Sequence, residues 1–321
     1  MSIPKIVNEF SSYFYDIVKQ IPEGRVTTYG VLAESLGDKI ASRAVGKMLN
    51  ENPTPIIVPC HRVVMSTGKI GGFGMGVEKK KELLENEGII VKKGRIKSFD
   101  KVLFTDFEAR PVLKELRDEQ NKAKEMIEIV DQVENPEIVG GVDVSYGEKK
   151  AYGSLSIWNE RDKIENVIVD LEISFPYIPT YLAYRELPVL KKLIETSDIS
   201  PDVVLVDGNG VLHPRGLGLA SHLGVEMDIS TIGVAKSQLT GKVNGNVSHE
   251  GPVKKITDNE RIIGYAYLSS SRAKNPIYIS PGNKVCFKTS LKVVKNHCDY
   301  KIPNPIRNAH ISANKRRKMN E

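Results

Sequence analysis

Apolar and polar positions follow two different patterns along the 321 residues of this chain. Up to about Gly88 the apolar residues recur at helical spacing, with amphipathic stretches at 6–20 and 79–87. From about Asp202 onward, short apolar runs of strand length alternate with helical stretches. We therefore predict an α/β protein, with a mainly helical N-terminal part and a C-terminal part that combines a sheet with helices.

A charged segment, VKKGRIKS at residues 91–98, separates the two patterns and has little periodicity of its own. Such a segment is typical of a linker. A long polar helix over 109–132 is expected to open the second part. Because the chain is about twice the usual size of a domain, we predict a first domain over 1–95, a linker over 96–106 and a second domain over 107–321.

Composition and charge narrow the class of protein. A hydrophobic share of 40% with 27% charged residues is typical of a globular chain with a buried core. No apolar run approaches the about 20 residues that cross a bilayer, and the N-terminus lacks a signal pattern, so we expect no membrane partner and a cytoplasmic location. Cys60, Cys286 and Cys298 have no spacing typical of disulfides or a zinc site. The net charge of +6 modestly favours a polyanionic partner.

Two short helices are predicted near the N-terminus, over 27–37 and 42–49, and together they suggest a helix-turn-helix. Tyr29, Arg43 and Lys47 lie on or near it and could face phosphates. The pattern is general, because any small helical domain can offer such a pair.

A lone cysteine follows the apolar run at 56–58, and such a residue is most often an inert buried side chain. Cys60, however, stands directly before His61 and Arg62. These neighbours can accept the thiol proton or supply positive charge, and both effects favour a reactive thiolate.

The residues around Cys60 resemble the catalytic domain of the O6-alkylguanine-DNA alkyltransferases. The resemblance spans most of residues 8–90 and rests on motifs in order: TYG at 28–30, RAVG at 43–46, NP at 52–53, PCHRV at 59–63 and EG at 87–88. The glycine-rich stretch GGFGMG at 71–76 does not match a phosphate-binding loop, so a substrate-lining loop is the better interpretation. Phe73 stands where many relatives have tyrosine, and the smaller N-terminal domain common in the family is absent.

The resemblance implies that the sulfur of Cys60 attacks the alkyl carbon on guanine O6. His61, oriented by Glu87 and acting through a water, would draw off the thiol proton. Tyr29 would protonate the departing guanine oxygen and help to turn the nucleotide out of the stack. The thioether that forms has no easy leaving group, so each molecule should act once.

Three further residues of this region are expected to meet DNA or shape the pocket. Arg43 would fill the gap that the extruded base leaves. Asn52 would brace the loop behind the cysteine. Met75, at a position where benzyl-tolerant relatives usually have glycine, is expected to narrow the pocket against bulky alkyl groups.

In the second part, the apolar runs at 138–142 and 203–206 each end in an aspartate, Asp143 and Asp207. If these strands are neighbours, both carboxylates reach the same edge of a sheet and can hold a divalent cation. An aspartate before a glycine is also a common turn residue, so the pattern alone leaves both interpretations open.

From about Phe107 to the C-terminus the chain resembles endonuclease V. The motifs in family order are FPYIP at 175–179, YRE at 184–186, DGNG at 207–210, HPRGLGLASH at 213–222, GVAK at 233–236, SPG at 280–282 and IPNPIR at 302–307. The resemblance implies a ribonuclease H-like mixed sheet with flanking helices. Its substrate would be double-stranded DNA that contains deoxyinosine, nicked at the second phosphodiester on the 3′ side.

The endonuclease resemblance assigns roles to particular residues. The ion would be Mg²⁺, with Mn²⁺ as a substitute. Lys236 would stabilise charge on the phosphate, and His213 would help to position water. The expected metal ligands are Asp143, Glu186, Asp207 and His310, although His310 alone could equally be a surface histidine.

The segment FPYIP is expected to separate the DNA strands. Tyr177 would be the wedge, because its ring can replace a lost stacking partner, and Pro176, Ile178 and Pro179 would stiffen its backbone and contact DNA. The alternative is an aromatic core residue in a loop. Asn283 stands where relatives often have histidine, and the basic run at 315–318 is expected to be a solvated tail.

Other functions stay open at this point. The first domain could merely sense O6 lesions, as alkyltransferase-like proteins do, but these relatives lack the reactive cysteine that Cys60 provides. The second domain could act mainly on inosine in RNA. We expect the protein to act as a monomer.

Overall fold

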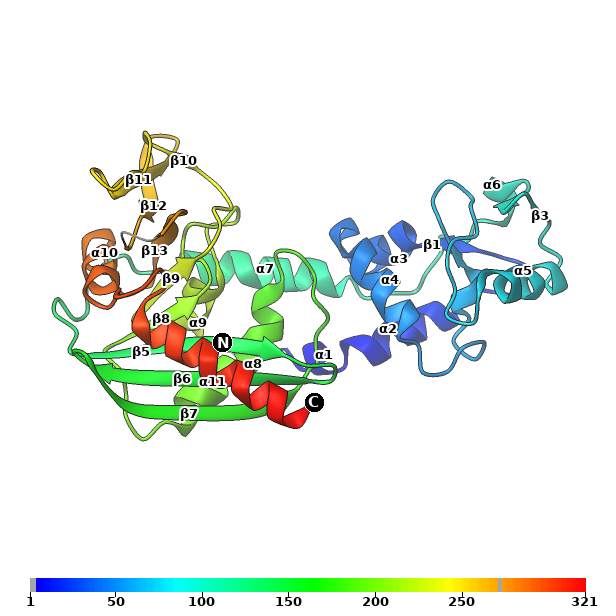
Figure 1. Cartoon of the computed structure of the whole chain (residues 1–321). Coiled ribbons are helices and arrows are strands. Elements are labelled where there is room, and N and C mark those ends of the chain that lie inside the picture. Colours follow the sequence, from blue (N-terminus) through cyan, green and yellow to red (C-terminus); the bar gives the residue numbers. More distant parts are fainter. Residues whose placement is uncertain (1–3, 271–272) are drawn as a thin grey trace. The chain divides into compact units, whose positions relative to one another are not determined.

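The computed structural model describes residues 4–270 and 273–321, and its contacts divide the chain into two compact units (Figure 1). The N-terminal unit comprises the described residues 4–118 together with the short segment Ser174–Leu182. The C-terminal unit comprises Glu119–Ile173 and Ala183–Glu321. Helix α7 (Val112–Glu125) runs from one set of residues into the other, and it is shorter than the polar helix expected over 109–132.

The N-terminal unit is mainly helical, as predicted. In helix α2 (Phe10–Lys19) the side chains of Phe10, Phe14, Ile17 and Val18 are buried, and this spacing places them on one face. The other elements of the unit are α1 (Lys5–Asn8), β1 (Thr27–Thr28), α3 (Tyr29–Ser35), η1 (Lys39–Ala41), α4 (Ser42–Asn50), η2 (Cys60–Arg62), β2 (Val63–Val64), α5 (Val77–Asn86), β3 (Val91–Lys92), β4 (Arg95–Ile96) and α6 (Phe99–Val102).

The predicted helix pair is present as α3 and α4. The Oγ1 atom of Thr28 accepts a hydrogen bond from the backbone N–H of Val31 at 3.1 Å and so caps α3. Gly37, with φ +100°, follows the helix and turns the chain. Strand β1 pairs in parallel with β2, which joins Thr28 to Val64 and so ties the start of α3 to the segment that follows Cys60.

The charged segment expected to be a linker instead forms a hairpin. Lys93 and Gly94 both have positive φ angles and make a two-residue turn between β3 and β4. Val91 and Ile96 are buried in a hydrophobic cluster with Val26 and Leu84. The expected linker over 96–106 therefore begins inside this core, and it continues into α6. Two-residue strands are too short to show a period, so the sequence pattern could not indicate them.

The C-terminal unit is built on a mixed sheet of nine strands in the order β10-β11-β12-β13-β9-β8-β5-β6-β7. Strands β5, β8 and β9 are parallel neighbours, and the other pairs are antiparallel. The predicted mixed sheet is confirmed. Its strands are β5 (Ile138–Tyr146), β6 (Lys150–Asn159), β7 (Asp162–Glu172), β8 (Val203–Asp207), β9 (Thr231–Ala235), β10 (Lys242–Val243), β11 (Val253–Asp258), β12 (Arg261–Tyr267) and β13 (Ile277–Asn283).

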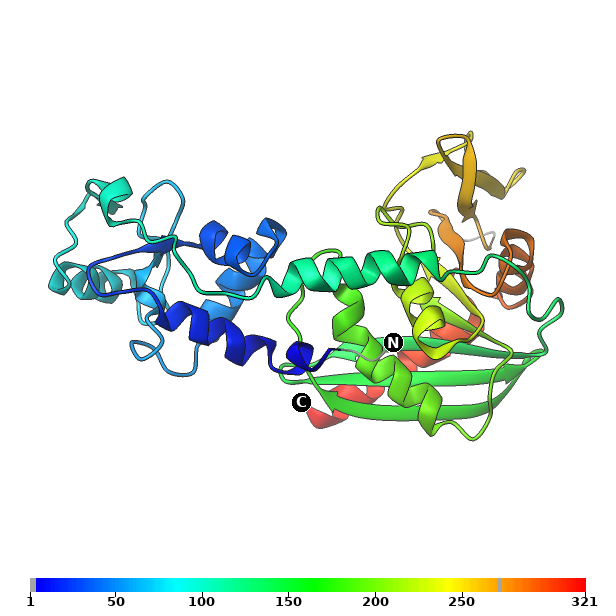
Figure 2. The ribbon, with the colours of Figure 1, turned by 180° about the vertical axis from the view of Figure 1, so that it is seen from behind.

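Helices cover both faces of this sheet. Helix α11 (Asn304–Asn320) crosses β5, β6 and β7 in Figure 1, and α8 (Leu182–Thr196) crosses the opposite face in Figure 2. Two glycines permit the close approach, because an added Cβ at Gly141 would clash with the backbone of α11 and one at Gly153 with Val189 of α8. Helices α9 (Leu219–Met227) and α10 (Phe287–Asn296) complete the unit.

The basic run at 315–318 is not a free tail, because it forms the last turns of α11. The guanidinium of Arg316 donates to both carboxylate oxygens of Asp170 on β7, at 2.7–3.1 Å. Across the described residues, no helix is both long enough and apolar enough to span a membrane.

Candidate active sites

Cys60 begins the short helical turn η2 and is almost fully buried. Asn52 holds the loop around it: its Nδ2 atom donates to the Sγ atom of Cys60 at 3.1 Å and to the carbonyl of Val58 at 3.0 Å. Its Oδ1 atom accepts from the backbone N–H of Thr54. Asn52 thus holds both the sulfur of Cys60 and the backbone of the loop before it.

His61 is buried beside Cys60, and its Nε2 atom lies 2.7 Å from Oε1 of Glu87. Burial lowers the pKa of His61 despite this carboxylate, so the ring is neutral at pH 7. Since Nε2 faces a carboxylate, it carries the proton, and Nδ1 is left with a lone pair. Within the described part of the chain, Nδ1 is buried without a hydrogen-bond partner. It is therefore available to accept a proton.

Arg62 was expected to supply positive charge to the thiol, but the structure places its guanidinium on Glu87. Its Nε and Nη2 atoms donate to the Glu87 carboxylate at 2.9–3.1 Å, and Nη1 donates to the carbonyl of Ile21 at 2.7 Å. Burial alone would raise the pKa of Glu87, but the bonds from Arg62 and His61 bring it below its usual value. Glu87 is thus a fixed anion that orients the imidazole.

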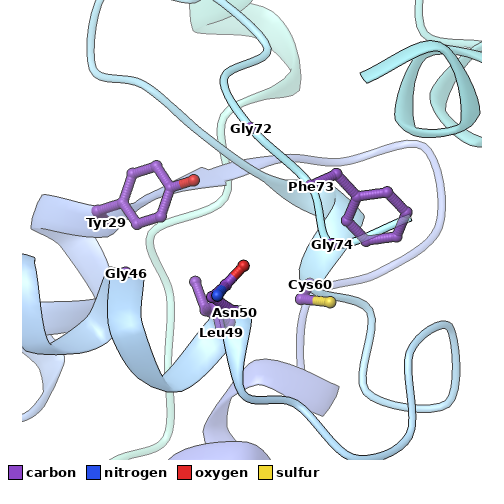
Figure 3. A pocket seen from close by; sticks show the side chains of 8 residues that line it. All are labelled: Tyr29, Gly46, Leu49, Asn50, Cys60, Gly72, Phe73 and Gly74. Atoms are coloured by element: carbon purple, nitrogen blue, oxygen red, sulfur yellow. The ribbon is translucent and has the colours of Figure 1, made fainter. Parts of the chain in front are cut away.

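A cavity of about 340 Å³ opens beside Cys60 (Figure 3). Tyr29 stands on one side of it and Cys60 on the other, with the side chain of Asn50 between them. Burial, and then the charge of Cys60, raise the pKa of Tyr29, so its hydroxyl keeps its proton at neutral pH. The lining residues are Tyr29, Gly46, Leu49, Asn50, Cys60, Gly72, Phe73 and Gly74.

The cavity corrects one sequence-based expectation and adds residues that the motifs did not indicate. Met75 is 49% exposed and is not among the lining residues, so it is not placed to narrow the pocket. Phe73, two residues earlier, lines the cavity instead, and its ring centroid lies 6.3 Å from that of His61. Leu49 and Asn50, in the last turn of α4, line the cavity, whereas Arg43 is exposed in the first turn.

A second site lies in the C-terminal unit, where two aspartates meet. Val142 pairs with Val206 across the parallel strands β5 and β8, so the following residues, Asp143 and Asp207, reach the same region of the sheet as expected. His310 of α11 joins them. Each of these three side chains offers a ligand atom, and these atoms lie within 4.8 Å of one another.

Glu186, on α8, also faces this acidic cluster. Burial, and then the charges of Asp143 and Asp207, raise the pKa of Glu186 to about 8. Burial and the charge of Asp207 also raise the pKa of Asp143. Crowded carboxylates that resist ionisation are stabilised by a bound divalent cation, and carboxylate oxygens are the ligands that Mg²⁺ and Mn²⁺ prefer. The donor set therefore fits such an ion.

Two basic groups complete the cluster. The Nζ atom of Lys236 lies 2.5 Å from Oδ2 of Asp207. Burial lowers the pKa of Lys236, but the bond to Asp207 and the nearby carboxylates raise it overall, so it stays charged. The Nδ1 atom of His310 lies 2.7 Å from Oδ2 of Asp143, and Nδ2 of Asn314 lies 3.0 Å from its other ring nitrogen.

His213 is not among the residues that the structure brings together as candidate cation ligands, within the described ranges. Its Nδ1 atom accepts from the backbone N–H of Arg215 at 3.2 Å, and burial lowers its pKa to about 4. His213 is therefore neutral at pH 7, and its ring bonds to the backbone two residues further along the chain. The expected role in positioning water thus has no support from this geometry.

The FPYIP segment belongs to the N-terminal unit. Tyr177 is 58% exposed, as a wedge requires, but Ile178 is fully buried and cannot contact DNA. Phe175 packs against Phe10 with ring centroids 4.8 Å apart, and the hydroxyl of Tyr181 donates to Asp38 at 2.7 Å. The residue types of the segment alone did not indicate which of its side chains are buried. Pro176 and Pro179 are partly buried on either side of Tyr177.

Asn283, which departs from the expected histidine, has a structural role. Its Oδ1 atom accepts from the backbone N–H of Glu128, and its Nδ2 atom donates to the carbonyl of Gly224. It is almost fully buried, so it fixes the backbone of these loops.

Comparison with protein families matches two separate stretches of the chain. Residues 9–89 match the family model of the 6-O-methylguanine DNA methyltransferase DNA-binding domain. Residues 121–311 match the family model of endonuclease V. The first stretch contains Cys60 and its cavity, and the second contains the acidic cluster.

Individual relatives resemble the chain over both stretches. A protein of Picrophilus torridus named bifunctional methyltransferase/endonuclease is 38% identical over 93% of this chain and 94% of its own length. One of the same name from Thermoplasma volcanium is 33% identical over 93% of this chain and 88% of its own length. The crystal structure of Ciona intestinalis endonuclease V, in complex with a DNA 24mer that contains an inosine followed by a ribo-adenosine, is 29% identical. It covers 65% of this chain and 99% of its own, with a TM-score of 0.60.

Proposed function

The chain belongs to the endonuclease V family and to the bifunctional methyltransferase/endonucleases, and from this premise we propose that it repairs two kinds of DNA damage. Its N-terminal unit transfers the alkyl group of O6-alkylguanine in double-stranded DNA to Cys60. Its C-terminal unit nicks DNA that contains deoxyinosine, at the second phosphodiester on the 3′ side. The observation that supports the pair of activities best is that each family match carries its own complete cluster of reactive side chains.

The transfer begins at Cys60 and His61. The thiol proton passes to Nδ1 of His61, directly or through a water, while Glu87 holds the ring and stabilises the imidazolium. The sulfur then bonds to the alkyl carbon as that carbon's bond to O6 breaks. Guanine leaves with the electron pair and takes a proton from the Tyr29 hydroxyl, which faces the same cavity. Each Cys60 is consumed, because the thioether has no easy leaving group.

Base extrusion explains the other residues of the N-terminal unit. A stacked guanine cannot reach the buried sulfur of Cys60, so the nucleotide must rotate out of the helix. Arg43, exposed on α4, fills the space left in the stack. Asn52 keeps the cysteine loop in place during the rotation.

Mass spectrometry tests the transfer. The chain is incubated with a duplex that contains one O6-methylguanine, and we expect a mass gain of one methyl group on the peptide that carries Cys60. Loss of the lesion without modification of Cys60 would contradict the proposal. Binding of the duplex with neither event would instead favour a lesion sensor.

For the nuclease, we propose that Asp143, Glu186, Asp207 and His310 hold Mg²⁺, with Mn²⁺ as a substitute. When bound, the ion would polarise the phosphate and make water a better nucleophile. Lys236 adds positive charge where the phosphate carries its negative charge. In the structure the Nδ1 atom of His310 lies 2.7 Å from Oδ2 of Asp143, so both side chains would reach the same ion. Tyr177 presents an exposed ring for stacking in the opened duplex.

A nicking assay tests the second activity. A labelled duplex with one deoxyinosine should yield a single nick in the presence of Mg²⁺ or Mn²⁺, and none with EDTA. Nicking that persists in EDTA would contradict the metal assignment. A matched inosine-containing RNA distinguishes the alternative, since faster cleavage of RNA than of DNA would assign the site to RNA.

We also propose that the two compact units are separate domains and that the chain acts as a monomer. The two family matches, 9–89 and 121–311, support separate domains. Light scattering of the purified chain tests the monomer, because a mass of twice 35.7 kDa would contradict it.

A further inference from the structure

Lys80 is a fully buried lysine that has no role in the proposed transfer steps at Cys60, His61, Glu87 and Tyr29. It lies in helix α5 (Val77–Asn86), one turn before the buried Leu84, and its exposed fraction is 0%. A buried ammonium group is unfavourable unless several partners replace its water. The ammonium group of Lys80 therefore needs hydrogen-bond acceptors within the core.

The ammonium group connects two segments of the alkyltransferase site. Its Nζ atom donates to the carbonyl of Val63 at 2.5 Å and to the carbonyl of Gly72 at 3.0 Å. Val63 directly follows the turn that carries Cys60, and Gly72 lines the cavity. One side chain thus joins the nucleophile's turn to the loop that forms part of the substrate pocket.

The charge of Lys80 also acts on the reacting groups. Burial lowers the pKa of Lys80 to about 8, and the neighbouring Cys60 opposes this shift, so the ammonium form still prevails at pH 7. The same positive charge contributes to the lowered pKa of His61. Cys60 and His61 are the titratable groups that face it. A cation at this point favours the thiolate of Cys60 and keeps His61 neutral and able to accept a proton.

We propose that Lys80 is a positioning residue for alkyl transfer: it fixes the cavity loop at Gly72 against the Cys60 turn, and its positive charge promotes ionisation of the thiol. This inference rests on the proposed transfer to Cys60. It predicts that Lys80 affects the rate of reaction of bound DNA and the ionisation of Cys60, but not the affinity for DNA, because no part of its side chain is exposed.

The test uses the full chain with Lys80→Met, Lys80→Gln and Lys80→Arg. Lys79→Met is the control, since it removes a neighbouring lysine that forms an exposed ion pair with Glu82. The methylation of Cys60 by an O6-methylguanine duplex is followed by mass spectrometry over a range of duplex concentrations. Separately, the pH midpoint of Cys60 alkylation by iodoacetamide reports the thiol pKa, and peptide mapping distinguishes Cys60 from Cys286 and Cys298.

For Lys80→Met we expect a maximal transfer rate about tenfold to a hundredfold lower, with the half-saturating duplex concentration unchanged, and a higher pH midpoint for Cys60. Lys80→Gln keeps a donor without charge, so its rate should recover in part while its midpoint stays high. Lys80→Arg should keep the midpoint near that of wild type, and Lys79→Met should match wild type in both readouts.

Equal midpoints in wild type, Lys80→Gln and Lys80→Met would overturn the inference, as would a maximal rate for Lys80→Met within twofold of wild type. If Lys80→Met does not fold, as judged by thermal unfolding, the midpoints of Lys80→Gln and Lys80→Arg decide, and equality overturns the inference again. A wild-type chain that leaves Cys60 unmodified would instead refute the proposed transfer itself, so the two failures are distinguishable.

Discussion

At the scale of single residues, burial sets which groups are charged at neutral pH. Burial lowers the pKa of His61 and brings those of His213 and His222 to about 4, so all three rings are neutral. Glu87 is held as an anion by its bonds from Arg62 and His61. The transfer site therefore combines a neutral base with a fixed anion behind it, which is the arrangement that general-base catalysis needs.

Glu87→Gln tests this arrangement. The substitution removes the anion that stabilises the imidazolium form of His61, so we expect alkyl transfer at pH 7 to slow by about tenfold to a hundredfold.

Because the folded-state pKa of Glu87 is depressed, its stabilising contribution is complete above the unfolded value of 4.5 and is lost as pH falls through the lower folded value. The free energy of unfolding, measured with urea, should thus fall more steeply below pH 4.5 in wild type than in the variant. Parallel pH profiles would show that Glu87 is not held as an anion.

His222 provides a separate prediction for the C-terminal unit. It is almost fully buried with its ring edge-on to Tyr184, and its pKa is lowered from 6.5 to about 4. Its contribution to stability is therefore complete above about pH 6.5 and is lost as pH falls towards 4. Between pH 7 and pH 4, wild type should lose about 3 kcal/mol more than His222→Asn in the free energy of unfolding of this unit. An equal loss in both proteins would exclude His222 as a titrating group.

At the scale of elements, long periodic segments were predictable and short or irregular ones were not. The strands that carry Asp143 and Asp207 were indicated by apolar runs that end in an acid, and their pairing placed both carboxylates together. The β3–β4 hairpin was missed because two-residue strands have no period. The helical structure of the C-terminal basic run was missed because the bidentate ion pair between Arg316 and Asp170 joins residues far apart in the chain.

The same limits apply to the sites. The motifs indicated Cys60, His61 and Glu87, which the fold brings together. They did not indicate Lys80, although its helical spacing with the apolar Leu83 and Leu84 is a usable signal. The exclusion of Met75 from the cavity could not be predicted, because side-chain direction in a glycine-rich loop depends on tertiary packing.

Gly153→Ala tests how the sheet positions α8. The added Cβ would clash with Val189 and press on Leu193, so the helix that carries Glu186 must shift. We expect a loss of about 1 to 3 kcal/mol in the free energy of unfolding of the C-terminal unit, and slower nicking of deoxyinosine DNA. Methylation of Cys60 should not change. Gly251→Ala is the matched control, because its Cβ would meet only the flexible end of Lys254 and the side chain of Ser248.

An effect of Gly251→Ala as large as that of Gly153→Ala would show that the result does not depend on the approach of α8. Normal nicking by a destabilised Gly153→Ala protein would show that the position of Glu186 tolerates a shift of the helix.

At the scale of the whole molecule, two chemistries with different requirements share one chain. In the proposed functions the transfer consumes one thiol, whereas the nuclease turns over and uses acidic side chains. The clusters have no residue in common: Cys60, His61 and Glu87 belong to the N-terminal unit, and Asp143 and Asp207 to the C-terminal unit. We therefore expect each activity to survive loss of the other.

The most direct measurement compares wild type, Cys60→Ala and Asp207→Asn in one reaction that contains Mg²⁺, an O6-methylguanine duplex and a labelled deoxyinosine duplex. Wild type should both gain a methyl group on Cys60 and nick the second duplex. Cys60→Ala should nick at a rate within twofold of wild type without being methylated, and Asp207→Asn should be methylated normally while its nicking falls by at least about a hundredfold. Loss of nicking in a folded Cys60→Ala protein, or loss of methylation in Asp207→Asn, would contradict the account of two independent sites.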